Sequence, residues 1–292
     1  KSVVSMTVGA ALCGGKIKSL DDLASTYVKE LSGSSYGKTS IRNLLTMSSG
    51  VLESFKQYQA SDFRSLLLKS DISGDVKQFN KSYDLKHLRR FLLSSDKRDS
   101  IVNYLSKRKS RDVDAGKNYL YNGQDTDTIG LVVARASGTT LAKYTSQEIW
   151  QKIGAKSSAK WLVDKDGDAS ARLGFYAQSL DWIRLGRFII NTLNGRLSDK
   201  CFANYLEKAT SGLISKKSRN GEWYGFQFHT NNAHISNAAF EMRGLGGQRL
   251  VINPVAETLL YSFAGALNGK WVGESGLYKL FSDFSSASNT RK

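Results

Sequence analysis

The sequence predicts an α+β protein, in which a mainly helical body is followed by an antiparallel sheet. Residues 20–213 carry helical patterns that begin at Ser or Thr and stop at glycine. After this region the chain changes to short aromatic and β-branched runs separated by turn residues. Strands and helices do not alternate, which argues against a parallel βαβ sheet. At 292 residues the chain is long enough for one large domain or two smaller ones.

The first element is expected to be a buried helix. The stretch "KSVVSMTVGAALC" is apolar on nearly all sides from Val3 to Leu12, which is the pattern of a helix enclosed by other elements. A helix start normally carries a side chain that accepts from the first free N–H groups, and Ser2 is the candidate for this role. Only Lys1 precedes it in the sequence.

The helices of the body follow in order. The stretch "SLDDLASTYVKEL" has Ser19 as its candidate cap, and "TSIRNLLTMSSG" begins at Thr39 or Ser40 and stops at Gly50. Two further helices, "TDTIGLVVARASG" and "SLDWIRLGRFIINTLNG", are each closed by a glycine. Residues 51–114 form a long, charged segment, for which a helical flap over a pocket and a surface elaboration remain equally open.

The sheet is expected at the end of the chain. The runs "EWYGFQFHT", "QRLVINP" and "ETLLYSFAGA" predict an antiparallel meander. The stretch "SGLYKLFSDFSS" then predicts a last amphipathic helix.

Composition excludes several classes of function. The net charge is +16, but no nucleic-acid-binding motif accompanies it, so we expect a solvated basic surface and no nucleic-acid partner. Weak attraction to anions or to a membrane surface is the remaining alternative. The basic residues cluster at two places, Lys107, Arg108, Lys109 and Arg111, and Lys216, Lys217 and Arg219. No run approaches the roughly 18 apolar residues of a membrane span.

Neither a metal nor a cofactor is expected. The three histidines, His87, His229 and His234, have no metal-ligand spacing, and no phosphate-binding glycine loop is present. Cys13 and Cys201 are too few for a disulfide framework, so two unpaired thiols are the favoured interpretation.

Blocks along the whole chain carry a family resemblance. They are "KSVVSM" continuing to "GGKIKSLDD", then "IRNLLTMSSGV", "AGKNYLYNGQDTDTIGLVVARASG", "ARLGFYAQSLDWIRLGRFI" and "MRGLGGQRLVINP". In this order the chain resembles the serine β-lactamase-like hydrolases, which include class C β-lactamases, family VIII carboxylesterases and 6-aminohexanoate-dimer hydrolases. The resemblance implies a β-lactamase/transpeptidase-like fold. It divides the chain into a nucleophile helix (1–19), a helical region (20–215) and the strands and final helix of the α/β part (216–292).

The resemblance also implies a site. Lys1 matches the lysine of the S-x-x-K motif, so the nucleophilic serine is expected three residues upstream, outside this sequence. In that family strands from before the nucleophile helix join the sheet, so we expect the chain to be the larger part of a longer protein. Tyr121 matches the catalytic tyrosine. Tyr119 is the other candidate for this position, and a tyrosine that merely packs in the core is the non-catalytic alternative.

A second group of residues is implied around the substrate. The backbone N–H of Gln248, after Gly246 and Gly247, matches the oxyanion hole, although two adjacent glycines are also typical of a bulge or turn. Gly123 stands where many relatives carry Asn or Ser. Leu245 stands where lactamases have Lys and many relatives His.

These departures favour a carboxylesterase or amidase that acts on small esters or linear amides and handles β-lactams poorly. A catalytically degenerate binding protein on the same scaffold is the alternative. The sequence leaves compartment and oligomeric state open.

Overall fold

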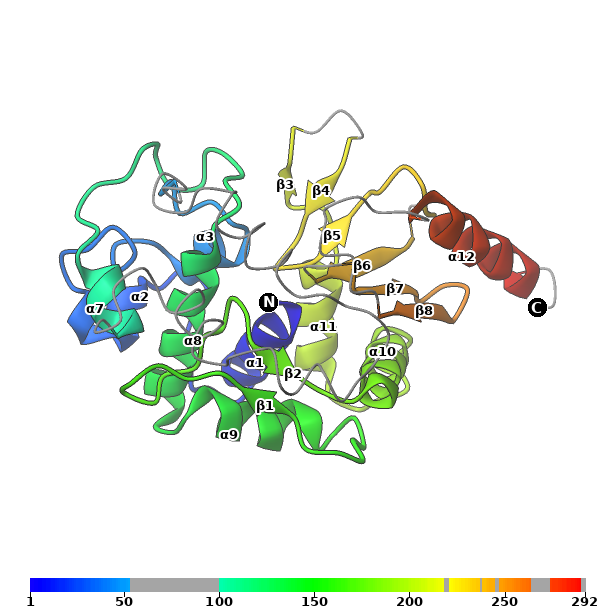
Figure 1. Ribbon diagram of the computed structural model, residues 1–292, viewed down its shortest axis with the longest axis horizontal. Helices are drawn as coiled ribbons and strands as arrows, with labels where there is room; N and C mark the ends of the chain where they lie inside the picture. The colour runs from blue at the N-terminus through cyan, green and yellow to red at the C-terminus, as the bar shows by residue number, and fades with distance from the viewer. Residues whose placement is uncertain (53–99, 218–220, 237, 245–246, 264–273, 290–292) are drawn as a thin grey trace, which may run out of the picture.

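A helical body and a six-stranded antiparallel sheet lie side by side in the computed structural model (Figure 1). The structure describes residues 1–52, 100–217, 221–236, 238–244, 247–263 and 274–289. Most of the charged 51–114 segment, with its proposed flap, therefore lies outside the described residues. The α+β class predicted from the sequence is confirmed.

The helical body contains most of the described helices. They are α1 (Ser2–Cys13), α2 (Ala24–Tyr27), η1 (Lys29–Leu31), α3 (Ile41–Leu45), α7 (Ile101–Ser106), α8 (Gly123–Ser137), α9 (Leu141–Thr145), η3 (Ser146–Trp150), α10 (Ser179–Leu193) and α11 (Lys200–Ala209). The last helix, α12 (Glu274–Asn289), follows the sheet as predicted. Gly138 ends α8 in the left-handed region at φ 67°, which is the glycine stop expected there.

The large sheet is a meander in chain order. Its strands are β3 (Ile214–Ser215), β4 (Trp223–Tyr224), β5 (His229–Thr230), β6 (Phe240–Arg243), β7 (Arg249–Asn253) and β8 (Thr258–Ser262). Every neighbouring pair is antiparallel, with Met242 opposite Leu250 and Ile252 opposite Leu259. A separate two-stranded sheet joins β1 (Lys160–Trp161) to β2 (Phe175–Tyr176).

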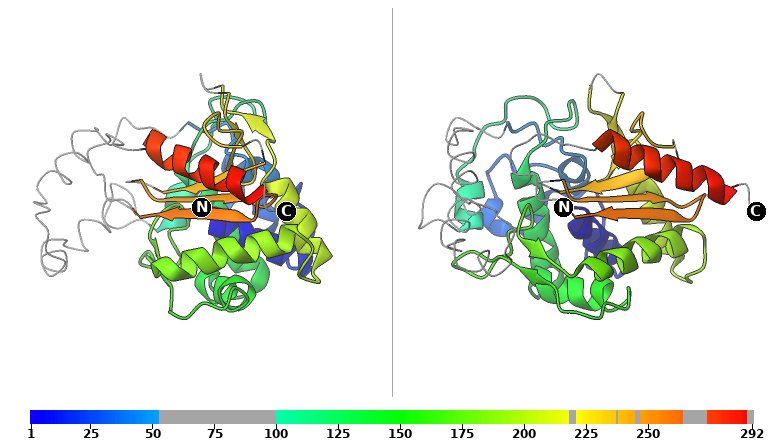
Figure 2. Two further views of the ribbon diagram at one scale, coloured as in Figure 1. Left: turned by 90° about the vertical axis from the view of Figure 1, so that its right-hand side faces the viewer. Right: turned by 45° about the vertical axis from the view of Figure 1, so that its right-hand side comes forward.

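The sheet is covered on both faces (Figure 2). Alternate side chains of a strand point to opposite faces. Leu250 and Ile252 therefore join the main core with the helical body, whereas Val251 packs with Tyr278 and Phe281 of α12. None of the helices in the described ranges is long and apolar enough to cross a membrane.

Helix α1 occupies the centre of the body. Every residue from Ser2 to Ala11 is buried, and the helix packs against α8, α9 and α11. The expected Ser2 cap is wrong in detail, because Lys1 is the N-cap residue and its side chain makes no cap hydrogen bond. The Ser2 hydroxyl instead donates to the carbonyl oxygen of Gln227 at 2.6 Å.

Two other residues, Ser40 and Ser19, were predicted to cap helices. Ser40 caps α3 as expected, accepting from the N–H of Asn43. Ser19 caps no helix, because its hydroxyl accepts from the N–H of Asp21 while α2 begins only at Ala24. The acidic run after Ser19 forms a turn, in which Asp22 accepts from the N–H of Ser19 and the hydroxyl of Tyr27.

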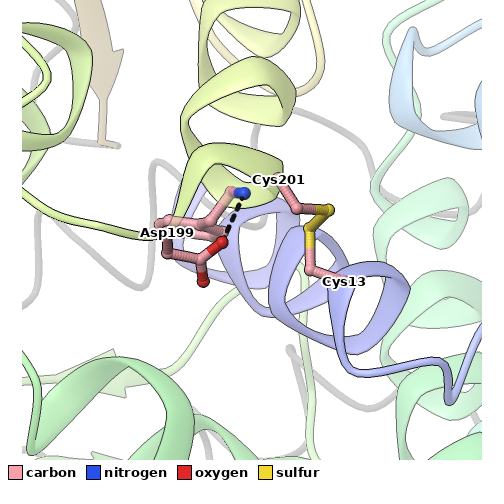
Figure 3. Close-up of a disulfide and its surroundings, with 4 residues drawn as sticks. Cys13, Asp199 and Cys201 are labelled. Carbon is pink, nitrogen blue, oxygen red and sulfur yellow. Dashed lines mark hydrogen bonds between the residues drawn. A yellow bond between two sulfur atoms is a disulfide. The ribbon is translucent and has the colours of Figure 1, made fainter.

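The prediction of two unpaired thiols is wrong. Cys13 and Cys201 form a disulfide that joins the end of α1 to the start of α11 (Figure 3). Asp199 lies beside it and caps α11 by accepting from the N–H of Phe202 at 2.9 Å. Two cysteines 188 residues apart give no local spacing signal, and only the packing of α1 against α11 brings them together.

Candidate active site

Lys1 lies at the start of α1, beside the sheet (Figures 1 and 2). Its side chain is half-buried, and its ammonium donates to the carbonyl oxygen of Arg172 at 3.0 Å. The Nζ atom also lies 5.0 Å from the centroid of the Tyr121 ring, a cation–π distance. The structure thus brings together the two residues that the sequence singled out for proton transfer.

Tyr121 belongs to an irregular segment that leads into α8. The N–H of Leu120 donates to the carbonyl oxygen of Met47 at 2.7 Å. Asn122 is fully buried and caps α8 by accepting from the N–H of Gln124 at 2.9 Å. Its amide nitrogen donates to the hydroxyl of Tyr36 and to the carbonyl oxygen of Val51. These bonds fix the backbone on both sides of Tyr121, whose side chain stays 46% exposed.

The rival tyrosine faces elsewhere. The ring of Tyr119 lies 5.1 Å from that of Tyr224 on the sheet, and 6.4 Å from that of Tyr121. Burial, followed by the neighbouring Tyr121, raises the pKa of Tyr119 far above its usual value. A hydroxyl that resists ionisation is poorly suited to act as a base, which argues against Tyr119 in that role.

Gly123 is the first residue of α8 and packs against Arg172. A Cβ atom at this position would come within 2.8 Å of the Arg172 Cδ atom. Arg172 in turn contacts Asp127 of α8 twice, through its backbone N–H at 2.9 Å and its guanidinium at 3.2 Å. Because the carbonyl of Arg172 also holds Lys1, this residue links the tyrosine segment to the start of α1.

Gln248 and Gly247 lie in the turn between β6 and β7. Gly247 has φ 101°, which favours glycine, and the N–H of Gly244 donates to the carbonyl oxygen of Gln248 at 2.9 Å. Among the described residues, the structure records no acceptor for the N–H of Gln248 and no hydrogen bond from Gln248 to Lys1 or Tyr121. Figure 1 and the right-hand view of Figure 2 show the start of α1 at the end of the sheet where β6 leads into β7. Leu245 and Gly246 lie outside the described residues.

The sequence did not predict a network of ion pairs near Tyr119 and Tyr224, which we call the ion network behind the tyrosines. Lys216 and Arg243 both pair with Glu222, and Arg243 also pairs with the fully buried Glu241. Burial opposes ionisation of Glu222, but hydrogen bonds from Arg243 and then Lys216 outweigh it and hold its pKa below the usual range. Lys216 was expected on a solvated basic face. Its partners are Glu222, directly before β4, and His229 on β5, and spacing along the chain did not reveal them.

His229 borders this network. Its Nδ1 atom lies 3.2 Å from the Lys216 ammonium, and its ring meets the edge of Tyr224 at 5.0 Å. Burial, and then the charges of Arg243 and Lys216, hold the pKa of His229 well below its usual value. Because an ammonium only donates, Nδ1 accepts and the proton of the neutral ring resides on Nε2. In the part of the chain that the structure describes, no group of His, Cys, Asp and Glu side chains is arranged to hold a metal ion.

Comparison with known families decides the identity of the fold. The model of the beta-lactamase family matches residues 1–264. The chain belongs to the beta-lactamase family. Membership assigns it to the serine hydrolases at the level of the family, as the sequence blocks predicted. No curated protein matches the sequence.

Solved structures agree with the beta-lactamase fold. The chain is similar to a putative 6-aminohexanoate-dimer hydrolase from Bacillus anthracis, with a TM-score of 0.76 and 21% identity over 99% of this chain and 71% of that one. It is also similar to the hydrolase EstCE1, which has promiscuous acyltransferase activity, with a TM-score of 0.68 and 12% identity over 98% and 82%. A class C beta-lactamase is similar with a TM-score of 0.63 and 16% identity, over 98% of this chain and 79% of that one. At these identities the likeness establishes the fold.

Proposed function

We propose that the protein hydrolyses short acyl esters or small linear amides through an acyl-serine intermediate. The nucleophile is the serine expected three residues before Lys1, in the S-x-x-K motif. Tyr121, as a phenolate beside the Lys1 ammonium, takes its proton as it attacks the carbonyl carbon and returns that proton to the leaving group. Water then cleaves the acyl ester by the same route in reverse.

The contact of Lys1 with Tyr121 carries this proposal. A tyrosine hydroxyl ordinarily ionises near pH 10, so a phenolate that acts as a base near neutrality needs a stabilising cation. The Lys1 ammonium lies 5.0 Å from the centroid of the Tyr121 ring, and we propose that it is this cation. Lys1 is also oriented by the Arg172 carbonyl, which leaves its remaining protons for substrate and serine.

The oxyanion hole is assigned to the backbone N–H of Gln248, together with that of the nucleophilic serine. Support comes from the positive φ of Gly247 and from the Gln248 N–H, which has no acceptor among the residues described. A preorganised donor that bonds to no other described group suits a developing oxyanion, because it needs little reorganisation.

The preference for uncharged substrates rests on Leu245. Where lactamases have a lysine, leucine offers no charge to a substrate carboxylate. One lost charge-assisted hydrogen bond costs ~1.5–3 kcal/mol, which is about one to two powers of ten in specificity. Uncharged esters do not feel this loss.

The test compares a p-nitrophenyl ester with a chromogenic cephalosporin, using the full-length protein. We expect ester turnover, an acyl adduct by intact-protein mass spectrometry, and loss of both when the serine before Lys1 is replaced by alanine. The Leu245→Lys variant should gain activity on carboxylate-bearing substrates only. Efficient cephalosporin turnover by the natural protein would overturn the assigned specificity. Absence of turnover on any ester or amide, with the serine present, would favour the binding protein.

A further inference from the structure

Gln227 has a backbone conformation that its side chain does not favour. It lies in the turn between β4 and β5, at φ 64°, and is only 1% exposed. The left-handed region is the ordinary place of glycine, and bulky residues there are uncommon. A strained residue in a buried turn persists where its surroundings hold it in place, and such residues gather at functional sites.

One set of Gln227 contacts closes the end of α3. Its backbone N–H donates to the carbonyl oxygen of Leu45 at 3.1 Å, and its side-chain amide nitrogen donates to that of Leu44 at 3.4 Å. The last carbonyls of a helix have no partner within the helix. Gln227 thus supplies donors to α3 from a strand turn that is distant in sequence.

A second set of contacts reaches the two helices of the candidate site. The carbonyl oxygen of Gln227 accepts from the hydroxyl of Ser2 at 2.6 Å, in the first turn of α1. Its side-chain oxygen accepts from the hydroxyl of Thr126 at 3.0 Å, in the first turn of α8. Ser2 follows Lys1 directly, and Thr126 lies in the turn of α8 that Tyr121 and Asn122 lead into. One residue is therefore bonded to both helix starts.

We propose that Gln227 is a positioning residue, which fixes the first turns of α1 and α8 relative to each other so that Lys1 meets Tyr121. The proposal rests on the function assigned above to that pair. Apolar packing between α1 and α8 sets their separation but has no direction. Hydrogen bonds to Ser2 and Thr126 are directional, so they fix the rotation of each helix about its axis and its position along that axis. Misplacement of catalytic groups by about 1 Å is enough to cost up to ~100-fold in rate.

The variant that tests this role is Gln227→Gly. Glycine keeps the turn conformation without strain but removes the two side-chain bonds, to Leu44 and Thr126. We expect kcat for the ester to fall about ten- to hundredfold with KM unchanged within about twofold. The acidic limb of the pH profile of kcat/KM should move, because the lysine–tyrosine separation sets the protonation of the pair.

A matched control lies at the other end of the sheet. Asn253 is also buried, and its side-chain oxygen accepts from the N–H groups of Val255 and Ala256. Asn253→Ala should lower the melting temperature at least as much as Gln227→Gly and leave the pH profile in place. Thr126→Val should reproduce part of the loss in kcat, and its effect should not add to that of Gln227→Gly, since both variants remove the bond between Thr126 and Gln227.

Two outcomes overturn the proposal. One is a Gln227→Gly variant with the kcat and pH profile of the natural protein. The other is full additivity with Thr126→Val. A readout without substrate separates this proposal from the assigned function. Hydrogen exchange should accelerate in the first turns of α1 and α8, and not in α12. If the natural protein turns over no ester but this exchange pattern appears, the positioning role stands and the assigned reaction falls.

Discussion

Lys1 and Tyr121 reach the same place from segments that are held in different ways. Lys1 begins a helix that is buried from Ser2 to Ala11, packed on several sides and tied to α11 at its far end by a disulfide. Tyr121 belongs to an irregular segment held by backbone bonds and by the buried Asn122, and its ring is 46% exposed. The helix that follows Lys1 is part of the core, whereas Tyr121 lies at the surface.

The difference separates stability from activity. Substitutions along α1 disturb many close-packed neighbours and should act first on the free energy of unfolding. Substitutions of the exposed tyrosine disturb few contacts and should act first on turnover. The predictions below test this division, beginning with the largest expected effect.

Tyr121→Phe should lower kcat/KM for the ester by about 10²–10⁴-fold, the range for a lost general acid or base. The melting temperature should change by no more than ~2 °C, because only the hydroxyl of a half-exposed residue is removed. Ester hydrolysis and thermal unfolding of the same samples measure both. Tyr176→Phe is the matched control, since that tyrosine is 48% exposed and lies on β2. Equal losses in the two variants would remove the special role of Tyr121.

Reduction of the Cys13–Cys201 disulfide should lower stability and leave turnover nearly unchanged, which is the opposite of the effect expected for Tyr121→Phe. The bond closes a loop of 188 residues, and removal of a native disulfide typically costs about 2–5 kcal/mol of unfolding free energy. Urea unfolding with and without a reductant measures the loss, and Cys13→Ser with Cys201→Ser should reproduce it. Turnover of the folded fraction at low temperature should stay within about threefold. A selective loss of turnover without loss of stability would show that α1 is not pinned as described.

The ion network behind the tyrosines predicts a pH dependence of stability. Burial and the nearby Arg243 and Lys216 hold the pKa of His229 well below 6.5, so the native ring stays neutral. The unfolded chain takes up a proton there below about pH 6.5, so it binds more protons than the native state. Stability should therefore fall between pH 7 and pH 5, by up to ~1.4 kcal/mol per pH unit from this group.

The variant His229→Gln isolates that contribution. Glutamine keeps an acceptor for the Lys216 ammonium but does not titrate. Urea unfolding at several pH values should give a smaller slope for the variant than for the natural protein. An unchanged slope would mean that another group produces the loss.

The sequence predicted the fold because its signals were local. Glycine stops, the Ser40 cap and the change from helical patterns to short aromatic and β-branched runs predicted the α+β class, and apolar patterns predicted the buried first helix and the final helix. It failed where a partner lay far along the chain. Neither the disulfide nor the Ser2 bond to Gln227 leaves a local pattern, and both decide how α1 is held.

The residues of the candidate site likewise divide into those that the sequence predicted and those that it did not. Lys1, Tyr121 and Gln248 were predicted because a family resemblance aligned them, and the contact between the first two is a geometric fact of the fold. Arg172 and Gln227 were not predicted. Each bonds to the start of α1 through its backbone carbonyl, Arg172 to Lys1 and Gln227 to Ser2, and no residue type marks such a carbonyl in the sequence.

The smallest effect is expected at Gly123, where the tyrosine segment and Lys1 share a neighbour. In Gly123→Ala the new methyl group would lie 2.8 Å from the Arg172 Cδ atom, so that side chain must move. Arg172 is held to Asp127 by its backbone as well, so its carbonyl should shift only slightly from Lys1. We expect kcat/KM for the ester to fall by about three- to tenfold. The free energy of unfolding should change little, because alanine favours the helix more than glycine does and this gain offsets most of the cost of moving Arg172.

Gly276→Ala on α12 is the matched control for Gly123→Ala, because an added methyl group meets nothing within 4 Å there. It should gain up to about 1 kcal/mol from helix propensity and leave turnover unchanged. A Gly123→Ala protein with natural turnover would show that Arg172 does not couple the two segments. A loss as large as that of Tyr121→Phe would show that Lys1 depends on this one carbonyl, and that the buried helix holds its first residue less firmly than the rest.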